Sequence, residues 1–232
     1  MKKIFHFLAV VGVLSGCLHA ELPKANTADE KKASSIARPA RTEAELPVPP
    51  EVMDLVKEAK AEFERSNFAE AEKCYDKAIA KAPDNSYLLS NMGVVLVCQR
   101  KYPLAEAALR KAIALAPEDP FSYLTLGIAE YQQGKIDEAI NELTKVLAIN
   151  PKSAPAHNYL GIAASEKGWP SAAQKELEMA ISLDPNYAEA HYNLTIVLTK
   201  QKPPNKLAAR DHYKRAVQLG READTALEAL IK

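Results

Sequence analysis

The 232-residue sequence has few cysteines, few glycines and no net charge. Its three cysteines are too few for a disulfide-stapled domain and too scattered for a structural zinc site. Basic and acidic residues number 30 each, which excludes the broad positive field that drives non-specific nucleic-acid binding, so no nucleic-acid partner is expected. Only eight glycines are present, and the strong helix formers Ala, Leu, Glu and Lys dominate. The composition therefore predicts a mainly α-helical chain.

The apolar run at residues 4–14 is too short to span a membrane, which takes roughly 20 residues. It follows two lysines and is typical of the h-region of a signal peptide. Residues 14–17 read Leu-Ser-Gly-Cys, which resembles the bacterial lipobox. The resemblance implies that residues 1–16 are a lipoprotein signal peptide and that Cys17 is acylated and anchors the chain to a membrane. The alternative is ordinary secretory cleavage after Ala20, which would give a soluble secreted or periplasmic protein.

Two further features bear on localisation. The residue after the cysteine is Leu18; an Asp there would resemble the inner-membrane retention signal, so its absence favours the periplasmic face of the outer membrane. Residues 17–50 contain five prolines among small and charged residues, and no aromatic residue. Such a segment cannot bury enough apolar surface to offset the entropy lost on ordering, so we expect a disordered tether.

A 34-residue period governs the chain from residue 51 onward. Three sets of positions keep this spacing in one register: a closing proline, an alanine, and a small residue early in each unit. They are Pro83, Pro117, Pro151 and Pro185; Ala71, Ala105, Ala139 and Ala173; and Ala59, Gly93, Gly127 and Gly161. A proline ends its helix, and small residues let two helices approach closely, so each period predicts a helix-turn-helix unit.

The pattern resembles the tetratricopeptide repeat (TPR). This resemblance implies an all-α fold: a right-handed superhelical solenoid of about five repeats, at residues 52–85, 86–119, 120–153, 154–187 and 188–221, with a capping helix at 222–232. The predicted domain is 51–232. Repeat five departs from the pattern, because Thr195 replaces the glycine and residues 202–205 lengthen its turn by two residues. The cap carries Leu227, Leu230 and Ile231 on one side, as expected for a helix that covers the end of a repeat core.

On a helical wheel, the first helix of each middle repeat is apolar on two sides: the side that stacks within the repeats and a second side roughly opposite to it. In the resembled family this side lines a concave groove that binds peptides or helices. The resemblance therefore implies a protein-binding groove, which in this chain comprises Tyr87, Ser90, Asn91, Val94, Val97, Phe121, Leu124, Ile128, Tyr131, Asn158, Ile162, Tyr192 and Ile196. Three alternatives stay open: neighbouring helices bury these residues, residues 21–50 fill the groove, or the array self-associates through it.

No catalytic set, cofactor motif or small-molecule site is evident in the sequence. His157 and His191 occupy the same position in successive repeats and could form a metal pair, but packing is the favoured interpretation. The sequence does not decide whether Cys74 and Cys98 are bonded to each other. We therefore expect a non-enzymatic scaffold or adaptor of the bacterial cell envelope, without cofactor or metal, that binds another protein and meets the membrane through Cys17. The alternative is an enzymatic or metal-binding accessory protein that uses the concave wall.

Overall fold

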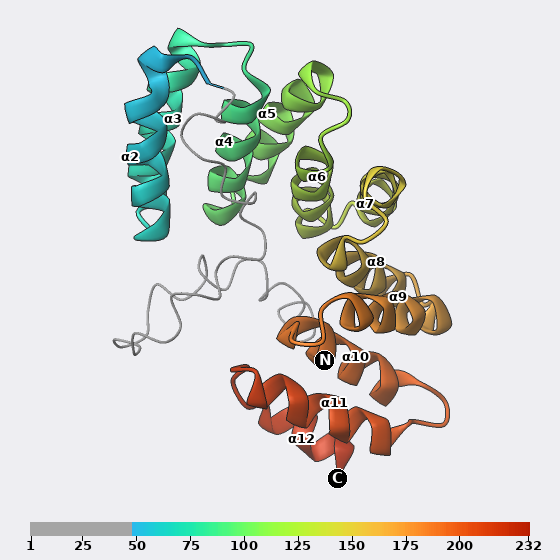
Figure 1. The fold of residues 1–232 in the computed structure, drawn as a ribbon. Coiled ribbons are helices and arrows are strands. Elements are labelled where there is room, and N and C mark those ends of the chain that lie inside the picture. Colours follow the sequence, from blue (N-terminus) through green and yellow to red (C-terminus); the bar gives the residue numbers. More distant parts are fainter. Residues whose placement is uncertain (1–47) are drawn as a thin grey trace. The chain divides into compact units, whose positions relative to one another are not determined.

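The computed structural model describes residues 48–232, and this part of the chain forms eleven α-helices and one short 3-10 helix, with no β-strand (Figure 1). The predicted all-α class is therefore confirmed. The signal peptide at 1–16, the acylation of Cys17 and nearly all of the tether at 17–50 lie outside the described residues. Within 48–232, no helix combines the length and the hydropathy needed to cross a membrane.

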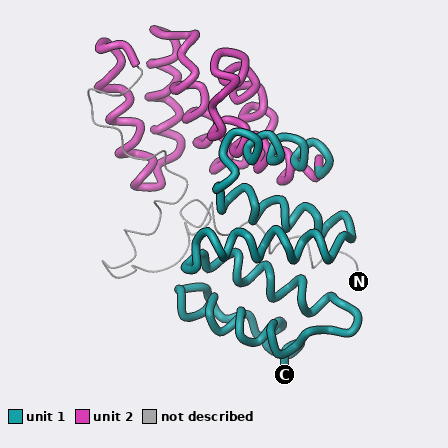
Figure 2. The backbone as a smooth tube through the Cα atoms, turned by 45° about the vertical axis from the view of Figure 1, so that its right-hand side comes forward, with its two compact units in different colours: residues 1–12, 136–232 teal, residues 13–135 magenta. Residues whose placement is uncertain are grey.

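The chain divides into two compact units, which meet in sequence between residues 135 and 136 (Figure 2). The described part of the N-terminal unit contains the 3-10 helix η4 (Pro50–Val52) and helices α2 (Met53–Glu64), α3 (Phe68–Lys81), α4 (Ser86–Cys98), α5 (Tyr102–Leu115) and α6 (Pro120–Gln132). The described part of the C-terminal unit contains α7 (Ile136–Ile149), α8 (Ala154–Glu166), α9 (Pro170–Leu183), α10 (Ala188–Lys200), α11 (Lys206–Gln218) and α12 (Thr225–Ile231).

Within each unit the helices stack in chain order as antiparallel hairpins. Helices α4 and α6 contact each other directly in the N-terminal unit, and α8 and α10 do so in the C-terminal unit. These are the first helices of successive repeats, so consecutive first helices form one wall of each unit. Helices α4, α6, α8 and α10 begin 34 residues apart, as the period predicts.

The repeated small and large residues are buried in the cores of the two units. The alanine set and the leucines at 109, 143 and 177 are all 0% exposed. A Cβ atom built on Gly161 would lie 2.6 Å from Leu177 Cγ and 3.1 Å from the Ala173 carbonyl oxygen. On Gly93 it would lie 2.5 Å from Leu109 Cγ. Any side chain at these two glycines would therefore push the paired helices apart.

Three-residue turns join the helices of the first, second and fourth hairpins, and each has a left-handed residue at the same register position. These residues are Ser66 (φ 61°), Arg100 (φ 60°) and Gly168 (φ 76°), and Gly134 (φ 76°) occupies the equivalent place after α6. The left-handed conformation lets the chain leave the first helix and turn sharply into the second. Asn85 and Ser153 cap α4 and α8 by accepting hydrogen bonds from the backbone of Leu88 and Ala156.

Repeat five has the longer turn that its sequence predicts, since five residues separate α10 from α11. Thr195 is fully buried in the place of the glycine, and its hydroxyl donates to the carbonyl of His191 at 3.0 Å. The capping helix covers the core with Leu227 and Ile231, which are each 5% exposed. Leu230 is 53% exposed, so its predicted place in the cap interface is wrong: α12 is a short helix, and this residue lies on its outer side.

Candidate protein-binding surface

All the predicted groove residues lie on first helices, but they are divided between the two units. Helices α4 and α6 carry nine of them, and α8 and α10 carry four. Eight are buried, with less than a tenth of each residue exposed: Tyr87, Ser90, Val97, Leu124, Ile128, Asn158, Ile162 and Tyr192. Five are partly exposed: Asn91, Val94, Phe121, Tyr131 and Ile196. The partly exposed residues are the ones that a partner could contact without a change of fold.

On α4, polar groups of the groove set are bound to the helix backbone. The Asn91 side-chain amide donates to the Tyr87 carbonyl at 2.6 Å, and the Ser90 hydroxyl donates to the same oxygen at 3.1 Å. The Lys60 ammonium of α2 lies 5.7 Å from the centroid of the Tyr87 ring. Within residues 48–232 the Asn91 side-chain oxygen accepts no hydrogen bond, so it is the part of this amide that an incoming N–H donor can bind.

In the C-terminal unit, buried amides join the two first helices. The Asn193 amide of α10 donates to the Asn158 side-chain oxygen of α8 at 3.0 Å, and the Asn158 amide lies 3.5 Å from the Tyr187 hydroxyl. Burial raises the pKa of Tyr187, so this hydroxyl stays protonated. These groups satisfy each other inside the wall, as buried polar groups must.

Tyr192 forms part of the contact with the C-terminal cap. Its hydroxyl donates to the Asp224 carboxylate at 2.7 Å, and the Arg221 guanidinium carbon lies 4.2 Å from its ring centroid. Asp224 also caps α12 by accepting hydrogen bonds from the backbone of Ala226 and Leu227. The side chain of Tyr192 thus has a structural role at the end of the repeats, which the helical wheel alone did not reveal.

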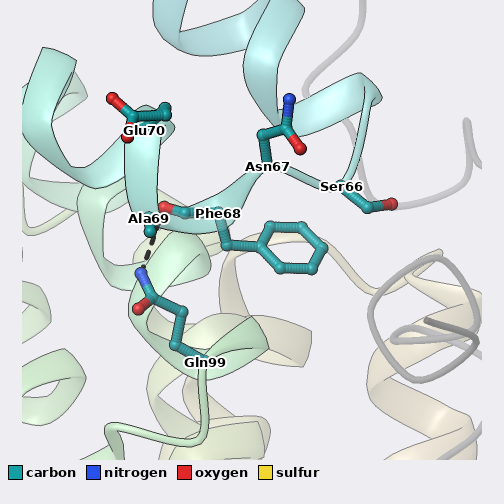
Figure 3. Close-up of a pocket in the computed structure, with 6 residues that line it drawn as sticks. All are labelled: Ser66, Asn67, Phe68, Ala69, Glu70 and Gln99. Atoms are coloured by element: carbon teal, nitrogen blue, oxygen red, sulfur yellow. Dashed lines mark hydrogen bonds between the residues drawn. The ribbon is translucent and has the colours of Figure 1, made fainter.

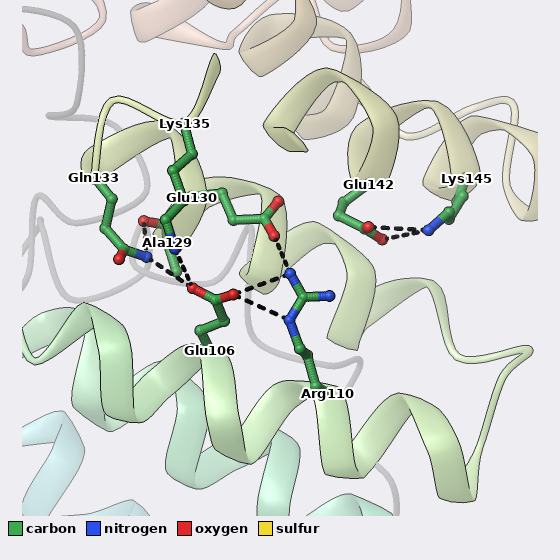
Figure 4. A network of polar contacts seen from close by, with 8 residues as sticks. All are labelled: Glu106, Arg110, Ala129, Glu130, Gln133, Lys135, Glu142 and Lys145. Atoms are coloured by element: carbon green, nitrogen blue, oxygen red, sulfur yellow. Dashed lines mark hydrogen bonds and ion pairs between the residues drawn. The ribbon is translucent and has the colours of Figure 1, made fainter. Parts of the chain in front are cut away.

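Polar contacts between successive hairpins were not foreseen from the sequence. Lys135 donates to Glu106 at 2.7 Å, and Gln133 donates to the same carboxylate at 3.3 Å (Figure 4). Arg110 binds Glu106 at 3.0 Å and the fully buried Glu130 at 2.8 Å. The hydrogen bond from Lys135 and those from Arg110 and Gln133 outweigh burial and lower the pKa of Glu106 to about 2.

The same arrangement occurs one repeat earlier, where Lys101 and Gln99 donate to Glu72 at 2.7 Å each. Burial alone would raise the pKa of Glu72, but these hydrogen bonds lower it. A signal for both contacts was present in the sequence, because Glu, Gln and Lys recur at the same positions 34 residues apart. In the C-terminal unit Figure 4 also shows an ion pair within α7, between Lys145 and Glu142 at 2.9 Å.

A pocket of about 360 Å³ lies at the turn of the first hairpin, where Phe68 and Gln99 line it together with neighbouring residues (Figure 3). The Gln99 amide donates to the Phe68 carbonyl at 3.1 Å, which ties the pocket floor to the second hairpin. The remaining lining residues are Ser66, Asn67, Ala69 and Glu70.

His157 and His191 each bind a partner on the second helix of their own repeat. His157 Nδ1 lies 2.7 Å from Glu176, and His191 Nδ1 lies 2.9 Å from His212 Nδ1. Burial lowers the pKa of both His191 and His212.

Cys74 is buried with a free thiol, so no bond joins it to Cys98, and burial raises the pKa of the Cys74 thiol. Residues 48–232 contain no cluster of three or more side chains of the metal-binding types.

Comparisons with known proteins identify the repeats. The protein-family model described as tetratricopeptide repeat matches residues 56–120. A second family model, described as TPR repeat, matches residues 127–168. A search of curated protein sequences gave no match.

Several solved structures share the fold. The pilF protein of Pseudomonas aeruginosa is 20% identical, with a TM-score of 0.68 over 77% of this chain and 80% of its own. MamA (residues 41 to end) of Desulfovibrio magneticus RS-1 is 21% identical, with a TM-score of 0.63 over 77% and 99%. TTC0263, a thermophilic TPR protein of Thermus thermophilus, is 17% identical, with a TM-score of 0.63 over 78% and 96%. The chain therefore contains TPR repeats in an all-α repeat fold, an architecture typical of protein-interaction scaffolds.

Proposed function

We propose that the chain is a non-enzymatic scaffold of the bacterial cell envelope that binds another protein on its first-helix wall. The observation that carries the proposal is the partly exposed apolar surface on the first-helix wall of the N-terminal unit, at Val94, Phe121 and Tyr131. Ile196 is partly exposed on the separate wall of the C-terminal unit. TPR repeats supply a rigid wall of this kind, and an extended segment or a helix can place apolar side chains against it. The bound partner contributes the complementary apolar anchors.

The buried groove residues have a supporting part in this proposal. Leu124 and Ile128, 7% and 2% exposed, hold α6 in place and keep the partly exposed Phe121 and Tyr131 in a fixed arrangement. A charged residue at either buried position would break the core, and it could not separate loss of binding from loss of folding. Substitutions for testing the wall therefore belong at the partly exposed positions.

The wall is tested with a double variant, Val94→Ser with Phe121→Ser, and a matched control, Leu104→Ser. Leu104 is 58% exposed and lies on α5, a second helix, so the control removes a comparable exposed apolar group away from the wall. The wild type and the control should each capture a partner from membranes that the double variant does not capture. All three chains should melt within a few degrees of one another. Equal retention of every captured protein by all three chains would reject the wall as the binding surface.

The envelope location rests on the lipobox-like residues 14–17, and it is tested separately. Cells that express the chain with a labelled fatty acid should yield labelled wild-type protein that partitions with membranes. The Cys17→Ser variant should lose the label and the part of its membrane association that the acyl chains supply, since two or more acyl chains hold a protein far more firmly than one. Label that persists in the Cys17→Ser variant would contradict acylation at this residue.

A further inference from the structure

The turn ends of the C-terminal unit expose two large apolar side chains. Trp169, the single tryptophan of the chain, is 50% exposed beside α9, and Leu207 in the first turn of α11 is 72% exposed. Both lie at the same end of their hairpins, because the Gln201 amide of the second turn donates to Gln174 near the start of α9 at 2.6 Å. Figure 1 shows the α8–α9 and α10–α11 turns at one edge of this unit. We call these two turns, with Trp169 and Leu207, the C-terminal rim.

The equivalent edge of the N-terminal unit is built from paired charges instead. The positions that correspond to Trp169 are Lys101 and Lys135, which bind Glu72 and Glu106. In the C-terminal unit the glutamate positions are occupied by Ile140 and Gln174, so they carry no negative charge. At this edge the C-terminal unit therefore has an exposed indole and uncharged neighbours where the N-terminal unit has ion pairs.

Lysines are frequent along the C-terminal rim, and three of them have no acidic partner within residues 48–232. Lys200, Lys202 and Lys206 are exposed, and they make no ion pair within residues 48–232. No acidic residue occurs between Thr199 and Arg210. The Lys167 ammonium lies 5.7 Å from the centroid of the Trp169 ring and pairs with Asp137 at 2.8 Å. The only other acid in the α8–α9 part of the rim is the exposed Glu166, so the rim keeps a positive surplus.

We propose that the C-terminal rim docks onto the surface of an anionic phospholipid bilayer. Tryptophan is favoured at the headgroup level of membranes, where its ring is apolar and its N–H stays hydrated. A protruding leucine can enter the boundary of the acyl chains, while lysines around it are attracted to acidic headgroups. Trp169 lies on a turn and Leu207 lies at the start of α11, and neither lies in a groove. This geometry suits a broad surface better than a peptide. The rim acts whether or not the first-helix wall holds a protein.

The test uses the intrinsic fluorescence of Trp169, because no other tryptophan contributes to the signal. All samples are the full chain with Cys17→Ser, so that acylation cannot contribute, and residues 1–16 are common to all of them. Vesicles of phosphatidylglycerol and phosphatidylcholine in equal parts should shift the emission to shorter wavelength, and brominated acyl chains should quench it. Vesicles of phosphatidylcholine alone should give a much smaller effect.

Two rim variants and two controls separate the rim from other causes of binding. The triple change Lys200→Gln, Lys202→Gln and Lys206→Gln should weaken vesicle partitioning at least about tenfold, and Leu207→Ala should weaken it several-fold. The controls are Lys77→Gln with Lys81→Gln on α3, and Leu104→Ala on α5; both should partition like the parent chain. All the substituted residues are exposed, so circular dichroism should be unchanged.

Three results would overturn the proposal. The first is an emission spectrum of Trp169 that anionic vesicles leave unchanged. The second is partitioning of the triple lysine variant that equals that of the control variants. The third is an emission shift caused by polyglutamate but not by vesicles, which would identify an acidic polypeptide as the ligand of the rim.

Discussion

Single residues decide how sharply the chain turns between the two helices of a repeat. The left-handed position at each turn is glycine at 134 and 168, but serine at 66 and arginine at 100. A residue with a Cβ atom pays a conformational cost in this region that glycine does not. The exposed side chain of Arg100 makes no hydrogen bond within residues 48–232 that would offset this cost.

The substitution Arg100→Gly should raise the free energy of unfolding by about 0.5–1 kcal/mol, because it removes the left-handed strain at an exposed position. The matched change Gly168→Ala at the equivalent turn should lower it by about 1 kcal/mol. Urea unfolding followed by circular dichroism measures both. Stabilisation by Gly168→Ala, or destabilisation by Arg100→Gly, would show that the turns are not held in this conformation.

A second residue-scale feature is the histidine pair of repeat five. His191 and His212 face each other through Nδ1 atoms 2.9 Å apart, so one ring must donate and the other accept, and protonation of both would break the contact. Nearby charges also shift the pKa values of the pair: Asp184 and Arg215 act on His191, and Glu178 and Asp211 act on His212. Burial lowers the pKa of both rings, so the folded state binds fewer protons than the unfolded chain near neutral pH.

Stability from this pair should be fully present above the unfolded histidine pKa, about 6.5, and lost as the pH falls below it. The variant His212→Glu recreates the pairing that His157 makes with Glu176, and it would raise the pKa of His191. The urea midpoint of the wild type should therefore fall between pH 7.5 and pH 5.5 by more than that of His212→Glu. The same fall in both chains would mean that the pair does not control this pH dependence.

At the scale of helices, carboxylates of second helices connect one hairpin to the next turn. Glu106 of α5 receives hydrogen bonds from Lys135 and Gln133, as Glu72 of α3 does from Lys101 and Gln99. No single hairpin can bury both of its faces, so stability depends on such contacts between repeats as well as on the apolar core. Glu106 is the more heavily bound of the two because Arg110 also donates to it.

The substitution Glu106→Gln should lower the free energy of unfolding by about 1–2 kcal/mol at pH 7, since it removes charge-assisted hydrogen bonds at a partly buried carboxylate. Glu70→Gln is the control, because Glu70 forms only an exposed pair with Lys73 and should change stability by less than about 0.5 kcal/mol. Thermal melting at pH 7 compares them. Equal losses in the two variants would contradict the role given to Glu106.

The loss of stability at acid pH gives a second measure of the Glu106 hydrogen bonds. The pKa of Glu106 is about 2 in the folded chain, below its ordinary value of 4.5. A lowered carboxyl pKa contributes stability that is complete above the unfolded value and is lost as the pH falls from about 4.5 toward 2. Wild-type stability should therefore decline more steeply over this range than that of Glu106→Gln.

At the scale of the whole molecule, the 34-residue period predicted the helices, and it could not predict which of the groove residues are buried. The alanine and leucine columns and the longer turn of repeat five follow from spacing alone, because the core of a repeat is local in sequence. Leu124, Ile128 and Ile162 are nevertheless buried, and Tyr192 contacts Asp224, which lies beyond its own repeat. A helical wheel shows the direction of a side chain, and it does not show what covers it.

Site-specific photocrosslinking in cells tests the central claim, that the first-helix wall binds another protein, most directly. A photoreactive phenylalanine analogue at Phe121 lies on the wall, and one at Leu104 on α5 is the control. We expect a covalent adduct with a second polypeptide from position 121 and none from position 104. An adduct from position 104 alone, or crosslinks from position 121 only to residues 21–50 of the same chain, would contradict the account.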